Sequence, residues 1–345
     1  MQDNNTQPVN PRSTDDFHVA VREWAAEVEE RRMRFAEPET RNGVFVSADR
    51  KAAWKAILDI LEVLIGIFDR HALRWSMCGG SLIGACREHG FVPWDDDIDV
   101  MLPRPDYERL QEILPRELPP HLFMQTSRTA PGMTGALMKV CDSRTTGIMP
   151  FFAERRFPMN YGLFVDILPI DPDPGDARNR RRLSKRGWNA RVIRYYHFFR
   201  KPRGIVEQAK KLVAEAAWRI LGGSDGLYEW RERPFRKMAE QQHDNWSIYP
   251  AHVGYIDRGH LKAEWLEEYI EVPFEYLMVK VLRHYDEALT QNYGDWRTPR
   301  SDASLHGELV LDAAVDFRTT LRSRFGWTDE ELRRLPSSDS SPTNP

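Results

Sequence analysis

The sequence predicts an α+β fold in which a small mixed, largely antiparallel sheet is flanked by helices and extended by a helical insertion. Three observations predict it. Helical periodicity dominates residues 47–71, short apolar segments typical of strands follow between residues 74 and 170, and the composition becomes basic and helix-favouring after residue 175. With 345 residues, of which 41% are hydrophobic, the chain can bury a sizeable core.

The first elements are expected to be helices. Residues 1–15 are polar and contain prolines, so we expect a disordered tail. Residues 17–35 have the pattern of a charged amphipathic helix. From Ser47, a suitable N-cap, apolar residues recur at helical spacing as far as His71, which predicts a buried helix.

Short strands and helices are then expected to alternate. Residues 74–78 are apolar enough for a strand, and Gly79-Gly80 should end it as a turn. Ser81 should open a short helix to about residue 86. Residues 98–102 have strand character, and residues 104–114 should form a helix with a proline in its first turn.

Three further strands are expected downstream. Residues 137–141 and 145–149 have strand character and are joined by a polar turn. Residues 161–170 (YGLFVDILPI) form the third, with Asp166 in the middle of an otherwise apolar run. An unpaired charge buried there would cost several kcal/mol, so Asp166 belongs either to a buried ion pair or to a functional site.

The chain divides by composition into a core and an insertion. We predict a catalytic core with N-terminal helices over residues 16–175, a basic helical insertion over residues 176–250, and a C-terminal part of the catalytic unit over residues 251–335. The Ser/Pro-rich residues 336–345 should form a second disordered tail.

Composition also narrows the function classes. The formal net charge of −3 gives no overall attraction for nucleic acid, and we expect no such partner. The cysteines, Cys78, Cys86 and Cys141, are odd in number and form no CxxC pair, which argues against disulfides and structural zinc. Without a signal-peptide pattern or an apolar stretch long enough to span a bilayer, we expect a cytoplasmic protein.

Two features predict a metal-dependent phosphate site. Asp97 and Asp99 alternate along a predicted strand, so their side chains should share one face. Such carboxylates suit one or two Mg²⁺ ions, which leave coordination positions for substrate phosphates. Upstream, the Gly79–Ser81 turn has no large side chain to block the backbone, and its amides could bind phosphate. Together they predict a site for a nucleotide diphosphate.

Other interpretations of the acidic run (WDDDID) were weighed. A solvated acidic loop is the simplest, although the glycines upstream and Asp166 downstream make it less attractive. An EF-hand would need glycine where Val100 stands and would contain two prolines. The D-x-D pair is also typical of nucleotide-sugar glycosyltransferases, and this alternative stays open.

The run from Cys78 to Leu110 (CGGSLIGACREHGFVPWDDDIDVMLPRPDYERL) closely resembles the signature of the LicD family, which includes fukutin-related proteins. Weaker pieces follow in the expected order: KVCDSRTT at 139–146, FVDILPID at 164–171, VPFE at 272–275 and YGDW at 293–296. The resemblance covers roughly residues 55–300. It departs from the family at Tyr276, where a glycine is usual, and in the basic middle segment, which puts acceptor recognition in doubt more than catalysis.

The resemblance implies a nucleotidyltransferase fold of the polymerase-β type and a transfer reaction. Family members move a phospho-alcohol such as phosphocholine from a CDP-activated donor to a glycan hydroxyl. Carried onto this chain, Asp97 and Asp99 would hold Mg²⁺ and Asp166 would be the third carboxylate. The implied substrate-binding residues are Gly79, Gly80 and Ser81 for the donor phosphate, with Arg87 and Lys139 as cationic candidates.

The basic segment at residues 178–203 mixes arginines with aromatic residues. One interpretation is an interfacial helix that holds the protein at the inner face of the membrane, where lipid-linked glycans are assembled. The other is a helix with a basic solvent face and an aromatic core face.

Overall fold

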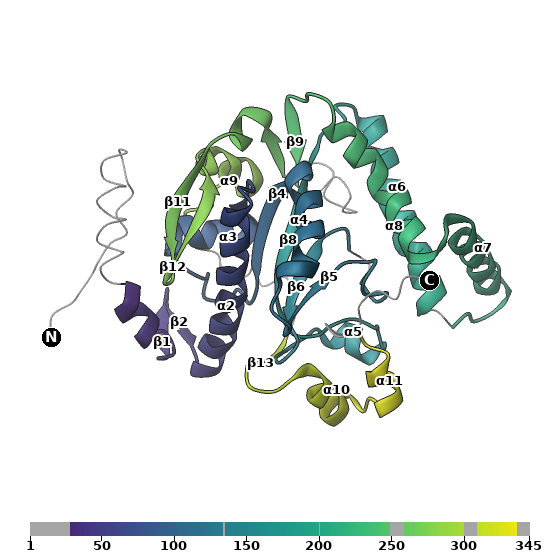
Figure 1. The fold of residues 1–345 in the computed structure, drawn as a ribbon, viewed down its shortest axis with the longest axis horizontal. Coiled ribbons are helices and arrows are strands. Elements are labelled where there is room, and N and C mark those ends of the chain that lie inside the picture. Colours follow the sequence, from purple (N-terminus) through teal and green to yellow (C-terminus); the bar gives the residue numbers. More distant parts are fainter. Residues whose placement is uncertain (1–27, 134, 200, 249–258, 300–308, 337–345) are drawn as a thin grey trace.

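A computed structural model describes residues 28–133, 135–199, 201–248, 259–299 and 309–336 (Figure 1). The predicted tail at residues 1–15 therefore lies outside the described residues, as do residues 337–345 of the tail predicted over residues 336–345 and most of the helix predicted over residues 17–35. Of that helix, residues 28–34 are described and are helical.

A mixed sheet forms the centre of the molecule (Figure 1). In the described part of the chain it has seven strands: β3 (Ser76–Met77), β4 (Ile98–Pro103), β5 (Leu122–Gln125), β6 (Met138–Asp142), β8 (Leu163–Pro172), β9 (Asn245–Ser247) and β10 (His260–Lys262). β8 is central. β4 runs parallel to it on one side, and β6 and β9 pair with it antiparallel on the other. The predicted mixed, largely antiparallel sheet is confirmed.

Helix α2 (Ala48–Arg70) covers one face of this sheet. Ser47 caps it, its Oγ accepting a hydrogen bond from the Arg50 amide at 3.2 Å, as the sequence predicts. The apolar stripe of α2 packs with Val100, Val165 and Ile167 in one hydrophobic core. Because side chains alternate along a strand, Asp99 and Asp166 lie on the opposite face.

The remaining elements surround this centre. Hairpins β1–β2 (Glu39–Arg41, Val44–Val46) and β11–β12 (Tyr269–Phe274, Leu277–Leu282) contribute to the α2 core, and β13 (Val310–Asp312) pairs with β7 (Thr146–Ile148). The other helices outside the insertion are α3 (Gly79–Ile83), α4 (Arg104–Glu117), α5 (Pro150–Glu154), α9 (Tyr285–Tyr293), α10 (Phe317–Phe325) and α11 (Asp329–Arg333), with a π-helical turn at Gly84–Glu88 and a 3-10 turn at Ala263–Leu266.

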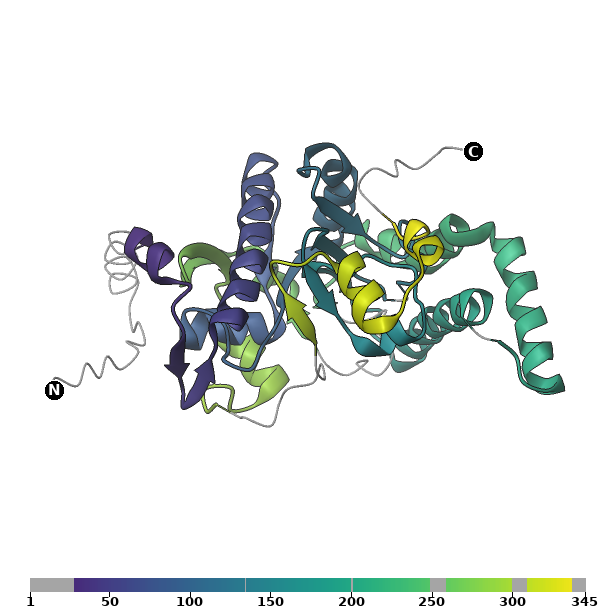
Figure 2. The same cartoon turned by 90° about the horizontal axis from the view of Figure 1, so that it is seen from below.

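Residues between β8 and β9 form the insertion helices α6 (Ala177–Phe198), α7 (Ile205–Leu221) and α8 (Gly223–Ala239). They lie to one side of the sheet, with α7 outermost in both views (Figures 1 and 2). α8 packs against β8 and α4, whereas α7 packs mainly on α6 and α8. The helical character predicted for this segment is confirmed.

One local expectation is corrected. Gly79-Gly80 is the first turn of α3 and not a separate turn before a helix at Ser81, because the extended Cys78 already takes the N-cap position. The two strands predicted after residue 137, joined by a polar turn, are confirmed as β6 and β7. β6 pairs with β5 and β8, while β7 pairs with β13.

No helix in the described ranges is both long and apolar enough to cross a membrane.

Candidate functional site

Three carboxylates meet on the face of the sheet opposite α2. Asp99 on β4 lies directly beside Asp166 on the parallel strand β8, and Asp97 immediately precedes β4. Their carboxylate oxygens lie within 4.8 Å of one another, and Asp97 and Asp166 are buried while Asp99 is half-buried. Buried clustered carboxylates offer the hard oxygen ligands that Mg²⁺ prefers. The donor set therefore fits the predicted metal.

The electrostatics of this cluster favour a bound cation. Burial, together with the charges of Asp97 and Asp166, raises the pKa of the Asp99 carboxyl well above its usual range. Lys139, opposite Asp166 in the register of β6, places its Nζ 2.6 Å from Asp166 Oδ1. That Nζ also lies 3.4 Å from the ring centroid of Phe164. Lys139 thus neutralises Asp166 in part.

The glycine pair lies against these carboxylates. Gly79 has a φ of +60°, and a Cβ there would lie 3.0 Å from Asp99 Oδ2. A Cβ on Gly80 would lie 2.5 Å from Asp95 Oδ2, which is too close. The Ser81 hydroxyl oxygen accepts a hydrogen bond from the Asp99 amide at 2.9 Å. Without side chains, the pair therefore lets the Asp95 and Asp99 carboxylates approach the backbone of α3 closely. Ser81 fixes the start of β4.

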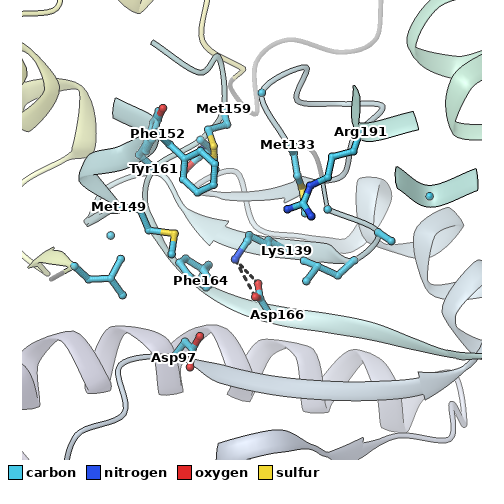
Figure 3. Close-up of a pocket in the computed structure, with 18 of the residues that line it drawn as sticks. Asp97, Met133, Lys139, Met149, Phe152, Met159, Tyr161, Phe164, Asp166 and Arg191 are labelled. Carbon is cyan, nitrogen blue, oxygen red and sulfur yellow. Dashed lines mark hydrogen bonds and ion pairs between the residues drawn. The ribbon is translucent and has the colours of Figure 1, made fainter. Parts of the chain in front are cut away.

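A pocket of about 270 Å³ opens above the cluster (Figure 3). Asp97, Lys139 and Asp166 lie at its polar end. Its apolar walls come from segments far apart in the chain, and their larger members are Met133, Leu137, Met149, Phe152, Met159, Tyr161, Phe164 and Leu309. The sequence does not predict these walls, because no local pattern distinguishes a pocket-lining methionine or phenylalanine from a core residue.

The insertion also contributes to this pocket. Gly187 and Arg191 of α6 and Arg231 of α8 line it, and Figure 3 shows the guanidinium of Arg191 directed toward the cavity. Arg231 is buried and donates to the Gly135 carbonyl oxygen at 2.9 Å. Arg191 is exposed. Part of the basic segment thus lies at this pocket, a placement that the sequence could not reveal.

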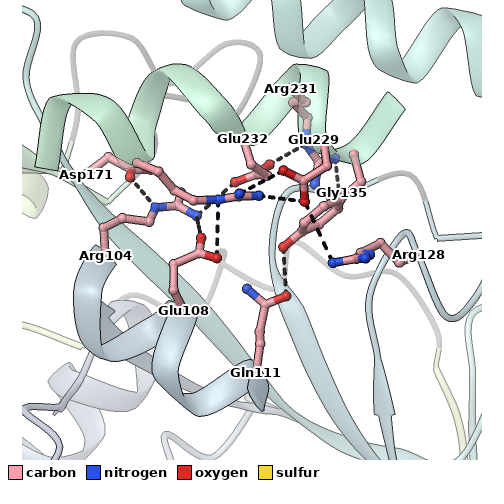
Figure 4. Close-up of polar contacts among 11 residues, drawn as sticks. Arg104, Glu108, Gln111, Arg128, Gly135, Asp171, Glu229, Arg231 and Glu232 are labelled. Carbon is pink, nitrogen blue, oxygen red and sulfur yellow. Dashed lines mark hydrogen bonds and ion pairs between the residues drawn. The ribbon is translucent and has the colours of Figure 1, made fainter. Parts of the chain in front are cut away.

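A buried ionic network fixes the insertion to the core (Figure 4). Arg104 of α4 binds Asp171 of β8 through two hydrogen bonds of 2.6 and 2.7 Å, and binds Glu232 of α8 at 2.9 Å. Arg231 donates to the same Glu232. Because Arg231 also lines the pocket, the network connects the position of α8 to the shape of the site.

Arg87 lies elsewhere. Its Nε donates to Glu88 at 2.6 Å and its Nη1 to the Trp296 carbonyl oxygen at 2.7 Å. It joins the π-helical turn to the YGDW segment and does not line the described pocket. Its predicted role in binding pyrophosphate stays a prediction.

The comparisons with known proteins agree with this geometry. A family model described as "LicD/FKTN/FKRP, nucleotidyltransferase domain" matches residues 72–189, which contain the glycine pair and all three carboxylates. Lipopolysaccharide cholinephosphotransferase LicD of Haemophilus influenzae is 30% identical over 257 residues, which cover 72% of this chain and 92% of that protein. The chain therefore belongs to the LicD family.

Proposed function

We propose that this protein is a Mg²⁺-dependent phosphotransferase that moves phosphocholine from CDP-choline to a hydroxyl of a lipopolysaccharide-type glycan. The observation that carries the proposal is the convergence of Asp97, Asp99 and Asp166 beside Gly79-Gly80, with Asp97 and Asp166 lining a pocket. The name of the Haemophilus influenzae relative supports both the transferred group and the kind of acceptor.

In this reaction the acceptor hydroxyl attacks the phosphorus that carries choline, and CMP leaves. One P–O bond forms and one breaks, and the hydroxyl proton is released. Mg²⁺ held by Asp97, Asp99 and Asp166 would neutralise the charge of the diphosphate and of the leaving CMP. The protein contributes mainly by positioning and electrostatics.

Asp166 is the group that we assign to the acceptor side. Lys139 binds both of its oxygens, at 2.6 and 2.9 Å, and so fixes the orientation of the carboxylate toward the pocket. Asp166 could then accept the hydroxyl proton or share the metal. The Gly79-Gly80 backbone, which approaches Asp99 without a side chain, is the proposed place for the donor phosphates.

The pocket walls suit the choline group. Aromatic faces attract quaternary ammonium ions, and Phe152, Tyr161 and Phe164 line the cavity. Asp97 at its polar end adds an attractive negative charge. Because Lys139 already lies against the Phe164 ring, the rings of Phe152 and Tyr161 are the main support for a methylated cationic alcohol over the uncharged ribitol or glycerol.

A ligand screen tests the proposal. With Mg²⁺ present, CDP-choline should raise the melting temperature more than CDP-ribitol, CDP-glycerol or UDP-sugars, because ligand binding stabilises the native state by mass action. Incubation with a lipopolysaccharide acceptor should then release CMP and add one phosphocholine mass to the glycan.

Three outcomes would count against the proposal. Turnover of a UDP-sugar without turnover of CDP-choline would favour the glycosyltransferase alternative. Turnover of CDP-choline that is equal with and without excess chelator would show that the reaction does not depend on Mg²⁺. A lack of stabilisation by every nucleotide would argue for a role other than catalysis.

A further inference from the structure

The outward face of α7 is apolar. Its inner side packs on the insertion, where Ala214 is buried and the Trp218 ring stacks on His197 with ring centroids 4.2 Å apart. On the other side, large apolar side chains are 68–84% exposed: Ile205, Val206, Leu212, Val213 and Ile220. The position of α7 at the edge of the molecule in both views leaves this side uncovered by the described chain (Figures 1 and 2).

These side chains form one continuous stripe. At 3.6 residues per turn they fall within roughly a third of the helix circumference. Exposed Ala209 and Ala216 lie between them on the same face. An exposed apolar stripe of this size indicates a contact with another surface.

The charges beside the stripe have one sign. Lys210 and Arg219 are exposed and border it on its two sides. The acidic residues of α7 are half-buried on the side toward the insertion, where Glu215 accepts from His197 Nδ1 at 3.0 Å and Glu207 accepts from the Arg203 amide at 2.6 Å. The outward face therefore combines apolar side chains with flanking cations.

We propose that α7 is an interfacial helix whose apolar stripe inserts into the surface of an anionic lipid bilayer. Helices that lie in a membrane surface have an apolar face bordered by lysine and arginine, which contact acidic lipid headgroups. This contact is distinct from the one expected at residues 178–203, because α6 buries Leu183 and Ala190 and directs Arg191 to the pocket.

The area of the stripe argues against a second copy of this chain as the occupant. A helix of 17 residues is about 25 Å long and about 10 Å wide, so its face covers roughly 250 Å². A stable protein interface needs about 800 Å² on each partner. A bilayer needs only the one face, since its interior accepts the apolar side chains directly.

The test compares full-length variants in vesicle sedimentation. The apolar variant carries Ile205→Asn, Leu212→Gln, Val213→Thr and Ile220→Gln, all on the exposed face, so the packing around Ala214 is unchanged. We expect the wild type to sediment with phosphatidylglycerol-containing vesicles and to bind less at high salt. The affinity of the apolar variant for these vesicles should be at least roughly tenfold lower than that of the wild type. A control, Arg181→Gln/Arg182→Gln/Lys185→Gln on exposed positions of α6, should keep most of the binding.

A label at the stripe provides a second readout. The native cysteines are buried or half-buried, so Leu212→Cys can be labelled selectively with an environment-sensitive dye. Its emission should shift to the blue with anionic vesicles, whereas a label at Lys55→Cys, on an exposed position of α2, should not respond. This readout decides the question even if the apolar variant fails to fold.

Several results would overturn the proposal. They are a wild type that stays in solution with anionic vesicles, an apolar variant that binds as well as the wild type, and a label at position 212 that ignores vesicles. A wild-type dimer in light scattering that the apolar variant converts to a monomer would instead assign the stripe to self-association. Activity on a short water-soluble acceptor should be unchanged in the apolar variant, so failure of the membrane contact is separable from failure of the proposed reaction.

Discussion

Two aspartates on the same strand have opposite environments. Asp171, near the end of β8, is fully buried and is held by Arg104 through two hydrogen bonds. Asp166, in the middle of β8, faces Asp97 and Asp99 and has Lys139 as its cationic partner. Around Asp171 the buried charges are balanced, because Arg104 and Arg231 meet Asp171 and Glu232.

The difference distinguishes a buried charge network that stabilises the fold from an acidic cluster that is suited to bind a ligand. A balanced buried network is satisfied by the protein itself, and its loss costs stability. In the acidic cluster, burial and the neighbouring carboxylates Asp97 and Asp166 raise the pKa of Asp99 well above its usual range, and a bound cation would relieve this repulsion. Four substitutions test this contrast.

The largest expected effect is on turnover at the acidic cluster. Asp99→Asn should lower CMP release by roughly 10³-fold or more, because it removes a proposed metal ligand at the reacting phosphate. The melting temperature without Mg²⁺ should be unchanged or higher, since a like charge is removed. Asp106→Asn, which removes a half-buried acid of α4 that pairs with Arg74, is the control and should keep turnover. Near-normal turnover by Asp99→Asn would remove the metal-site assignment.

The balanced network should respond in the opposite way. Arg104→Met leaves Asp171 and Glu232 buried with fewer partners, so it should lower the free energy of unfolding by about 3–5 kcal/mol. Urea denaturation measures this loss, and the molecules that stay folded should still turn over substrate. A stability loss under about 1 kcal/mol would mean that solvent already screens this network.

A smaller effect is expected where backbone approaches the acidic cluster. Gly80→Ala places a Cβ against Asp95 Oδ2 and into the proposed phosphate space, so it should weaken CDP-choline binding by about 1–2 kcal/mol. Calorimetry with Mg²⁺ measures the affinity. Gly66→Ala in α2, where the nearest atom to the new Cβ is a flexible Arg70 nitrogen at 3.4 Å, is the matched control. Equal donor affinity in the Gly80 variant and the wild type would contradict the proposed binding of the donor phosphates at the Gly79-Gly80 backbone.

The smallest expected effect concerns the insertion wall. Arg191→Gln should raise the KM for one substrate by roughly fivefold while kcat changes little, because an exposed guanidinium contributes about 1 kcal/mol to binding an anion. Arg191→Lys should recover part of the loss, and Arg181→Gln, outside the pocket lining, should have no effect. A fall in kcat in both Arg191 variants would instead indicate that the substitutions disturb the packing of the pocket wall.

The sequence was sufficient for the local parts of the site. Alternation along a strand correctly placed Asp97 and Asp99 together, and the resemblance to the LicD family supplied Asp166 and Lys139. The parallel pairing of β4 with β8, which brings Asp99 beside Asp166, joins segments far apart in the chain and leaves no local pattern. The same holds for Phe152 of α5 and Arg191 of α6, which line the pocket from segments far from β4 in the chain.

The insertion has a further consequence for how this enzyme can change over evolution. Its helices begin after β8 and return at β9, so they can vary in sequence without moving the strand positions that carry the carboxylates. Arg191 and Arg231 line the pocket from this segment, whereas Asp97 and Asp166 lie on the core. Under the proposed function, preference for an acceptor would diverge between relatives while the reaction stays the same, and we expect an exchange of residues 177–239 between two such proteins to transfer that preference.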